Sequence, residues 1–297
     1  MHGIENLYIG PSGWSHEDWQ GVFYPEKRPR GFHELAWLAQ WYNLVEINSS
    51  WYHPQSVHAS RSWLKAVQPN PRFRFTARLW QKFLLERSSY TSQDVLLVRH
   101  GMDVLMDAGR LGALLLSFPQ SFHNNIETRS WLFRIITEFK MYPLIVEFRH
   151  NSWEAPEVLQ MLRDRDVGIA SIDQPIVGNG MPLRTLSTAT FACFTLYGRN
   201  TEKWFDEQAD RNARHDYLYS KEELLEFRQA VEKAIKAATA VYVVFGNHFR
   251  GQALCNAFEL QHMLTGQNPA IPRDLVRAFP ALQNIRRRQN PRQLELW

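Results

Sequence analysis

The chain has 297 residues, of which 44% are hydrophobic, and this length suits one large domain or two ordinary ones. It contains no apolar run of about 20 residues, so we expect no membrane span, and its N-terminal segment lacks the features of a secretory signal peptide. Two widely separated cysteines, Cys193 and Cys255, exclude a disulfide framework and a zinc ribbon. These features predict a protein of the reducing cytoplasm.

The net charge of +4 is located at the C-terminal end of the chain. Residues 273–297 hold two acidic residues and six arginines, which are Arg273, Arg277, Arg286, Arg287, Arg288 and Arg292. The rest of the chain is therefore neutral. A basic tail of this kind is suited to contact nucleic-acid phosphate, and a solvated end without a partner is the alternative.

Eight short apolar segments have the composition of buried parallel strands. In chain order they cover residues 7–10, 44–48, 73–78, 111–118, 144–149, 167–172, 191–197 and 240–245. Segments with helical periodicity separate most of them, over residues 32–42, 56–67, 94–108, 128–139 and 155–165, from the capping box at 220–223 onward, and over 251–264. Residues 174–190 show no clear helix, and residues 198–220 form a long polar loop, which is typical of a functional or mobile segment.

This alternation predicts an α/β fold, and eight units favour a closed (β/α)8 TIM-like barrel over residues 1–266. The alternative is an open doubly wound sheet, but the first strand-to-helix turn lacks a G-x-G-x-x-G motif. For residues 267–297 we expect an irregular basic tail that wraps the surface or is partly disordered.

Polar and aromatic residues gather at the C-terminal ends of the predicted strands, where barrel enzymes place their sites. They are Gly13 and Trp14, Glu46 and Asn48, Arg78, Glu147, Arg149 and Trp153, Asp173, Tyr197, and Asn247 with His248. We therefore expect these side chains to surround one pocket at the barrel mouth.

Three carboxylates of this set, Glu46, Glu147 and Asp173, leave three interpretations open. They can perform acid–base chemistry, they can hold a divalent metal with histidine ligands, or they can form structural ion pairs with Arg78 and Arg149. No metal-binding motif is present, so the cofactor is unknown. The two arginines are shaped to bind phosphate or carboxylate through paired hydrogen bonds.

The aromatic residues of the set have two interpretations as well. Trp14, Trp153 and Tyr197 could wall the pocket and stack on a base or a sugar, or they could belong to the core. His248 after a buried strand is either a ligand-binding group or a structural histidine.

Several segments resemble the DUF72 (YecE-like) family. They are YIGPSGWSHEDWQGVFYP at 8–25, VEINSSWY at 45–52, RFRFTAR at 72–78, LGALLLSFPQSF at 111–122, VEFRHNSW at 146–153 and FGNHFRGQALCNAFEL at 245–260. The resemblance implies a TIM-like barrel whose biochemical role is unsettled. It places a polar signature on Gly13, Trp14, Glu46, Asn48, Glu147, Arg149, Trp153 and Asn247.

The chain departs from the family pattern at three strand ends. Arg78 stands where relatives usually have lysine, and Arg cannot serve as a base or a Schiff-base amine. Tyr197 stands where a histidine is typical, and Gly246 precedes Asn247 where paired asparagines are typical. The architecture is also similar to that of endonuclease IV and xylose isomerase, but their dense metal-ligand set is not evident here, so this similarity concerns the fold alone.

Three functional hypotheses follow. The first is a protein with a small ligand and hydrolase or isomerase chemistry. In it Glu147 and Glu46 act as acid and base, Arg78 and Arg149 hold an anionic or sugar-like ligand, and Asn48 and Asn247 orient that ligand. The second is a nucleic-acid-associated barrel that uses the aromatic rim and the basic tail. The third is a non-catalytic module with structural ion pairs, so enzymatic activity is left open.

Overall fold

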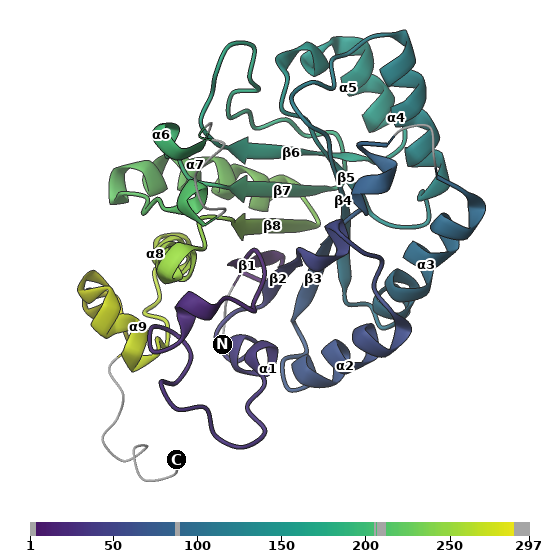
Figure 1. Ribbon diagram of the computed structural model, residues 1–297. Helices are drawn as coiled ribbons and strands as arrows, with labels where there is room; N and C mark the ends of the chain where they lie inside the picture. The colour runs from purple at the N-terminus through teal and green to yellow at the C-terminus, as the bar shows by residue number, and fades with distance from the viewer. Residues whose placement is uncertain (1–3, 87–89, 205, 207–211, 288–297) are drawn as a thin grey trace.

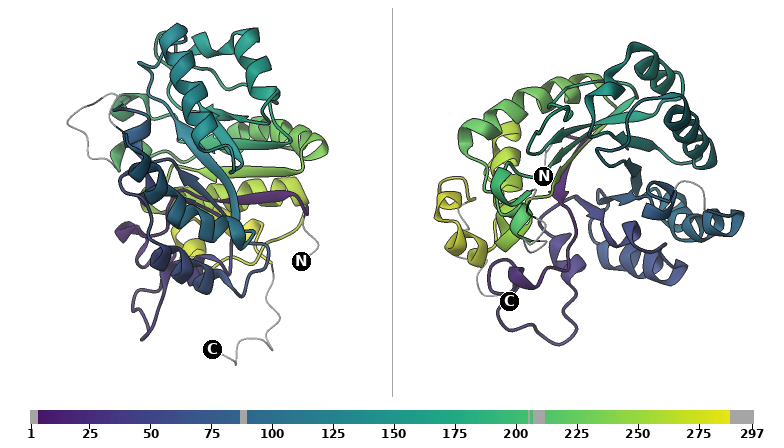
Figure 2. Two further views of the ribbon diagram at one scale, coloured as in Figure 1. Left: turned by 90° about the vertical axis from the view of Figure 1, so that its right-hand side faces the viewer. Right: turned by 45° about the horizontal axis from the view of Figure 1, so that its top comes forward.

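Eight parallel strands form the centre of the molecule in the computed structural model, which describes residues 4–86, 90–204, 206 and 212–287. The sheet order is β1-β8-β7-β6-β5-β4-β3-β2. The strands are β1 Leu7–Pro11, β2 Leu44–Ile47, β3 Arg74–Arg78, β4 Leu111–Ser117, β5 Leu144–Glu147, β6 Gly168–Asp173, β7 Phe191–Leu196 and β8 Ala240–Phe245. Helices surround the sheet on its outer side (Figures 1 and 2).

The barrel is nearly closed where β1 meets β2. The backbone N–H of Gly13 donates to the Glu46 carbonyl at 2.9 Å, and Ser12 forms a parallel bridge with Glu46. A Cβ atom at Gly10 would lie only 1.8 Å from the Leu44 carbonyl oxygen, so this approach of the two strands requires glycine. The prediction of a (β/α)8 TIM-like barrel is confirmed, and the open-sheet alternative is wrong.

The described helices are α1 Glu34–Leu38, α2 Val57–Val67, α3 Ser92–Asp107, α4 Ile126–Glu138, α5 Pro156–Arg163, α6 Thr201–Trp204, α7 Lys221–Ala237, α8 Gln252–Thr265 and α9 Arg273–Ala278. Six of these helices lie close to their predicted positions, α1 is shorter than the predicted segment 32–42, and α6 and α9 form where a polar loop and an irregular tail were predicted. Ser220 and Glu223 form the predicted capping box of α7, and Pro156 occupies the first turn of α5. No helix within these ranges is long and apolar enough to cross a membrane.

The segment after residue 266 differs from the irregular tail that we expected. Residues 273–278 form α9, and a 3-10 helix follows over Pro280–Asn284. Ile271, Leu275 and Leu282 are buried, because their apolar side chains extend the hydrophobic core beyond α8. Arg288 and Arg292, which belong to the predicted basic segment, lie outside the described residues.

Candidate functional site

Side chains from five strands meet at the carboxyl end of the barrel, because all eight strands run in the same direction. Glu46 is the last residue but one of β2, and Arg78 and Glu147 are the last residues of β3 and β5. Ser12 and Tyr197 directly follow β1 and β7. Together with Arg149 they form what we call the mouth network.

Glu46 is the acceptor at one side of this network. Its carboxylate is buried, and Oε1 accepts a hydrogen bond from Arg78 Nε at 2.9 Å. The Ser12 hydroxyl lies 2.8 Å from the same oxygen and 2.9 Å from the side-chain oxygen of Asn48. The buried Glu46 carboxylate is thus paired with a largely buried guanidinium, whose side chain is 16% exposed, and such pairing is the condition under which a buried charge is tolerated.

Tyr197 joins this pair to a second one. Its hydroxyl accepts a hydrogen bond from Arg78 Nη2 and donates to Glu147 Oε2 at 2.7 Å. Burial raises the pKa of the phenol, the nearby Arg78 opposes this, and the carboxylates of Glu147 and Glu46 raise it further. Tyr197 is therefore a neutral group that relays hydrogen bonds between two charged pairs.

Arg149 is the most open member of the mouth network. Its Nη2 lies 3.3 Å from Oε1 of the fully buried Glu147, and its guanidinium carbon lies 5.4 Å above the Tyr197 ring. Its side chain is 26% exposed, and no other hydrogen bond from it reaches a described residue. A guanidinium carries five N–H donors, so most of the donors of Arg149 face solvent at the mouth.

Asp173 does not join Glu46 and Glu147, as we had expected from its strand end. It forms a separate rim cluster with Arg199, Tyr219 and Glu223. Arg199 Nε lies 3.0 and 3.1 Å from the two Asp173 oxygens, Nη1 lies 3.1 Å from Glu223 Oε1, and the Tyr219 hydroxyl donates to Asp173 Oδ2 at 2.6 Å. Burial raises the pKa of Asp173 although Tyr219 and Arg199 act in the opposite direction.

Asn247 holds the segment that carries the rim cluster. It is fully buried, and its Nδ2 donates to the Tyr217 carbonyl at 2.8 Å and to Asn256 Oδ1 at 2.9 Å. Asn256 in turn donates to the Tyr219 carbonyl at 3.0 Å. The Nδ2 of Asn247 is therefore used within the protein, while its buried Oδ1 has no hydrogen-bond partner among the described residues.

His248 belongs to a stack of three imidazole rings, which we call the histidine column. Its ring centroid lies 4.4 Å from that of His16 and 4.6 Å from that of His215. Burial lowers the pKa of His215 to about 4, with help from the charge of Arg78, and lowers that of His248 to about 2, with help from His16 and His215. The pKa of His16 is also lowered by burial. The column is therefore uncharged at neutral pH.

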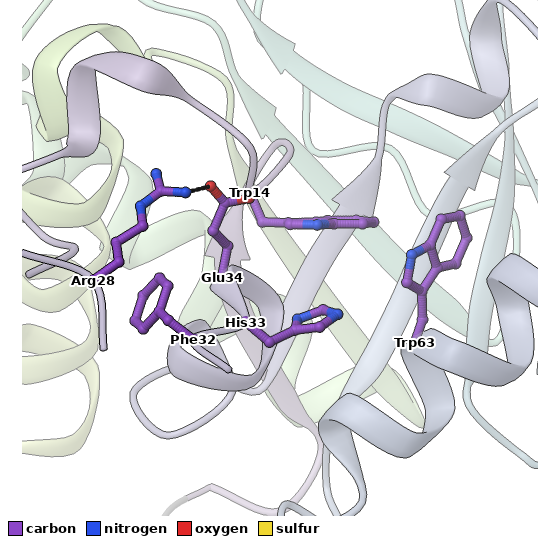
Figure 3. A pocket seen from close by; sticks show the side chains of 6 residues that line it. All are labelled: Trp14, Arg28, Phe32, His33, Glu34 and Trp63. Atoms are coloured by element: carbon purple, nitrogen blue, oxygen red, sulfur yellow. Dashed lines mark ion pairs between the residues drawn. The ribbon is translucent and has the colours of Figure 1, made fainter. Parts of the chain in front are cut away.

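The two tryptophans predicted to wall the pocket occupy different places. Trp153 is fully buried, stacks on Phe148 with 4.4 Å between ring centroids, and donates its indole N–H to the Phe122 carbonyl. It is a core residue rather than a pocket wall. Trp14 is half-buried and lines a separate hollow with Trp63, whose ring centroid is 5.3 Å away (Figure 3). Gly13 precedes it with φ of +79°, a conformation that favours glycine.

The predicted carboxylates are not arranged as metal ligands. Both carboxylate oxygens of Glu147 and of Asp173, and Oε1 of Glu46, accept hydrogen bonds from arginine, tyrosine or serine. Among the residues that the structure describes, no three histidine, cysteine or acidic side chains are placed together so that they could hold a metal ion.

Six residues of these clusters were not among the predicted site residues: Ser12, His16, Arg199, His215, Tyr219 and Glu223. Three of them lie between residues 198 and 220, where the long polar loop was the only signal. Ser12 follows the first strand directly, so its position at a strand end could have identified it.

Comparison with known proteins agrees with the barrel fold. Residues 8–281 match the family described as "Protein of unknown function DUF72". The chain belongs to the DUF72 family. The match extends beyond residue 264, the limit of the segments that suggested this family, and includes α9.

Individual DUF72 relatives cover nearly the same length. The UPF0759 protein YunF of Bacillus subtilis is 23% identical over 273 residues, which are 87% of this chain and 94% of that protein. The crystal structure of a DUF72 protein from Thermotoga maritima is 30% identical and has a TM-score of 0.76, with 87% of this chain and 98% of that chain covered. One from Enterococcus faecalis is 26% identical, also with a TM-score of 0.76, and covers 87% of this chain and 95% of that chain.

Proposed function

We propose that this DUF72 protein binds a small ligand with a phosphoryl or carboxylate group at the mouth of the barrel. The observation that supports the proposal is that Arg149 makes one hydrogen bond to a described residue and leaves its other donors unused. Its contact with Glu147 is long, at 3.3 Å, and most of its donors face solvent beside a neutral, buried phenol. A partly desolvated guanidinium with unused donors is the group that binds an oxyanion best.

The charge balance of the mouth network favours an anion over a cation. Its two carboxylates and two guanidiniums cancel in number, but they are not equally accessible. Glu46 and Glu147 are 1% and 0% exposed, whereas the Arg149 side chain is 26% exposed. A ligand that approaches the mouth therefore meets a positive group first, and the low dielectric of the buried surroundings strengthens that attraction.

Within this proposal the carboxylates position the cationic groups. Glu147 accepts hydrogen bonds from Tyr197 and Arg149, and Glu46 accepts one from Arg78. The acid–base chemistry predicted for Glu147 and Glu46 would act on the ligand only after it has bound at Arg149. Glu147 accepts one hydrogen bond on each oxygen, so each oxygen keeps a lone pair that could take a proton from a ligand.

Calorimetric titration with inorganic phosphate, phenyl phosphate and citrate tests this function. We expect saturable binding of at least one probe, and a loss of at least about tenfold in affinity in Arg149→Gln, because a charge-assisted hydrogen bond contributes about 1.5–3 kcal/mol. Arg74→Gln is the matched control, since Arg74 lies at the opposite end of β3 and contacts the Tyr8 ring. Absence of binding, or equal binding by Arg149→Gln and the wild type, would overturn the proposal.

A DNA oligonucleotide in the same titration examines the nucleic-acid alternative. Binding that weakens steeply with salt and after removal of residues 284–297 would favour that alternative over a small anion. Binding of the small probes alone would favour the proposal.

A further inference from the structure

A second concave site lies apart from the mouth network, and its lining is unlike that of the mouth. The hollow has a volume of about 300 Å3 and is lined by Trp14, Arg28, Phe32, His33, Glu34 and Trp63 (Figure 3). These residues come from the loop after β1, the loop before α1, the first residue of α1, and α2. None of them belongs to the mouth network or to the rim cluster.

The side chains of the hollow are held in place by contacts behind them. The Trp14 carbonyl accepts a hydrogen bond from the Tyr24 hydroxyl, and Trp63 packs against Phe75 in the core. Arg28 donates from Nε to Gln20 Oε1 at 2.7 Å and forms an ion pair with Glu34 at 2.8 Å. A ligand would therefore meet a preformed surface, which lowers the entropy cost of binding.

The charge of the hollow favours a neutral ligand. Arg28 and Glu34 are its only fully charged side chains, and their ion pair neutralises both. Neither an anion nor a cation has an unpaired partner there, but the pair still offers N–H donors and carboxylate acceptors at fixed positions. The indole N–H groups of Trp14 and Trp63 donate to no described residue and are not buried, so they are available as well.

The arrangement of the two indoles favours a puckered ring over a flat one. Their planes are inclined at 80°, so Trp14 and Trp63 do not form the parallel slot into which a nucleobase would slide. A sugar ring has an apolar face of C–H groups, which packs on the electron-rich face of an indole, and hydroxyl groups around its edge. We propose that this hollow is a binding site for a neutral sugar unit, with its ring on the indoles and its hydroxyl groups on Arg28 and Glu34.

Saturation-transfer NMR with the methyl glycosides of glucose, galactose, mannose and N-acetylglucosamine tests this site. We expect saturable transfer to at least one glycoside, and an affinity lower by about tenfold or more in Trp14→Ala and Trp63→Ala, as for other ligands that stack on aromatic side chains. Trp80→Ala is the matched control, because Trp80 is also half-buried but does not line the hollow.

Arg28→Ala provides a variant that leaves the core intact, since Arg28 is 41% exposed. It removes the cation that neutralises Glu34, so we expect weaker glycoside binding and new binding of tetramethylammonium on an exposed indole face beside Glu34. No saturable transfer to any glycoside, or glycoside binding that is unchanged in both tryptophan variants, would overturn the proposal. Binding of adenosine alone, or of tetramethylammonium by the wild type, would also overturn it. Trp14 and Trp63 line the hollow and are not part of the mouth network, so a loss of glycoside binding in their variants is independent of the anion binding proposed at Arg149.

Discussion

The mouth network and the rim cluster contain the same kinds of side chain but use them differently. Each combines arginine, tyrosine and carboxylate. In the rim cluster, Arg199 is surrounded by Asp173, Glu223 and Glu226, with distances of 3.0, 3.1 and 3.5 Å. In the mouth network, Arg149 contacts one carboxylate at 3.3 Å. The comparison shows that an arginine near a barrel mouth becomes a candidate for ligand binding when the protein leaves its donors unused.

The two regions also differ in how many carboxylates neutralise each arginine. Glu46 and Glu147 are the acidic members of the mouth network, whereas Asp173 shares Arg199 with two other acidic residues. Loss of one carboxylate therefore leaves a net positive charge inside the barrel in the first case, and a still neutralised arginine in the second. The predictions below depend on this difference.

The largest effect is expected for Glu46→Gln. The substitution leaves the guanidinium of Arg78 without its closest counterion in a buried position, and such a loss typically costs about 3–5 kcal/mol. Chemical denaturation should show this decrease in the free energy of unfolding. A cost below about 1 kcal/mol would mean that water reaches Arg78 and that the network is not a buried one.

The histidine column connects the two regions, since His215 lies 6.4 Å from the Tyr197 ring and on the segment that leads to Tyr219. Burial lowers the pKa of all three histidines below 6.5, so the unfolded chain takes up protons that the folded protein excludes. The contribution of the uncharged column to the free energy of unfolding is fully present above pH 6.5. It decreases as the pH falls toward about 4, where His215 itself takes up a proton in the folded protein.

His248→Gln measures the contribution of the column. Each proton that the folded protein excludes adds up to about 1.4 kcal/mol per pH unit to the slope of the free energy of unfolding against pH. Removal of one histidine should reduce this slope by that amount. The measurement is the free energy of unfolding at several pH values between 6.5 and 5. An identical slope in the wild type and in His248→Gln would show that this ring is protonated in the folded protein.

A smaller effect is expected for Asp173→Asn. Arg199 keeps its ion pairs with Glu223 and Glu226. Burial raises the pKa of Asp173, which means that the folded protein disfavours its charged form, so removal of this charge offsets part of the loss. We expect a loss of about 1–2 kcal/mol, mostly from the hydrogen bonds to Arg199 and Tyr219. A loss as large as that of Glu46→Gln would remove the distinction between the two regions.

The smallest effect on stability is expected for Arg149→Gln. The contact with Glu147 is long, at 3.3 Å, and the amide of glutamine can still donate to the buried Glu147 carboxylate, which also keeps the hydrogen bond from Tyr197. We therefore expect a loss of about 1 kcal/mol. Thermal unfolding without ligand should therefore change little, while anion binding is lost. A large decrease in stability would assign Arg149 a structural role, as in the non-catalytic hypothesis.

The sequence was sufficient to predict the barrel and part of the mouth. Short apolar segments mark the eight strands, and the direction of parallel strands brings Glu46, Arg78, Glu147 and Tyr197 to the same end. The pairing within this set did not follow from the sequence. Tyr197 links the two ion pairs through its hydroxyl, and only the curvature of the barrel brings β7 near β3 and β5.

Other features depended on contacts between distant segments. Arg199 is paired with Asp173 from a loop without periodicity, and Trp153 is drawn into the core by Phe122 and Phe148. The helix α9 forms because its apolar residues find a surface beside α8, although its sequence appears basic and irregular. These contacts depend on tertiary packing between distant segments, which local sequence patterns do not predict.

Anion binding at Arg149 can be seen in a crystal of the protein soaked in tungstate, a phosphate analogue that is located by its anomalous scattering. We expect an anion within hydrogen-bond distance of Arg149 at the barrel mouth and none at Arg199, whose donors are already used by carboxylates. An anion at Arg199, or none at Arg149, would show that unused arginine donors do not mark the binding site.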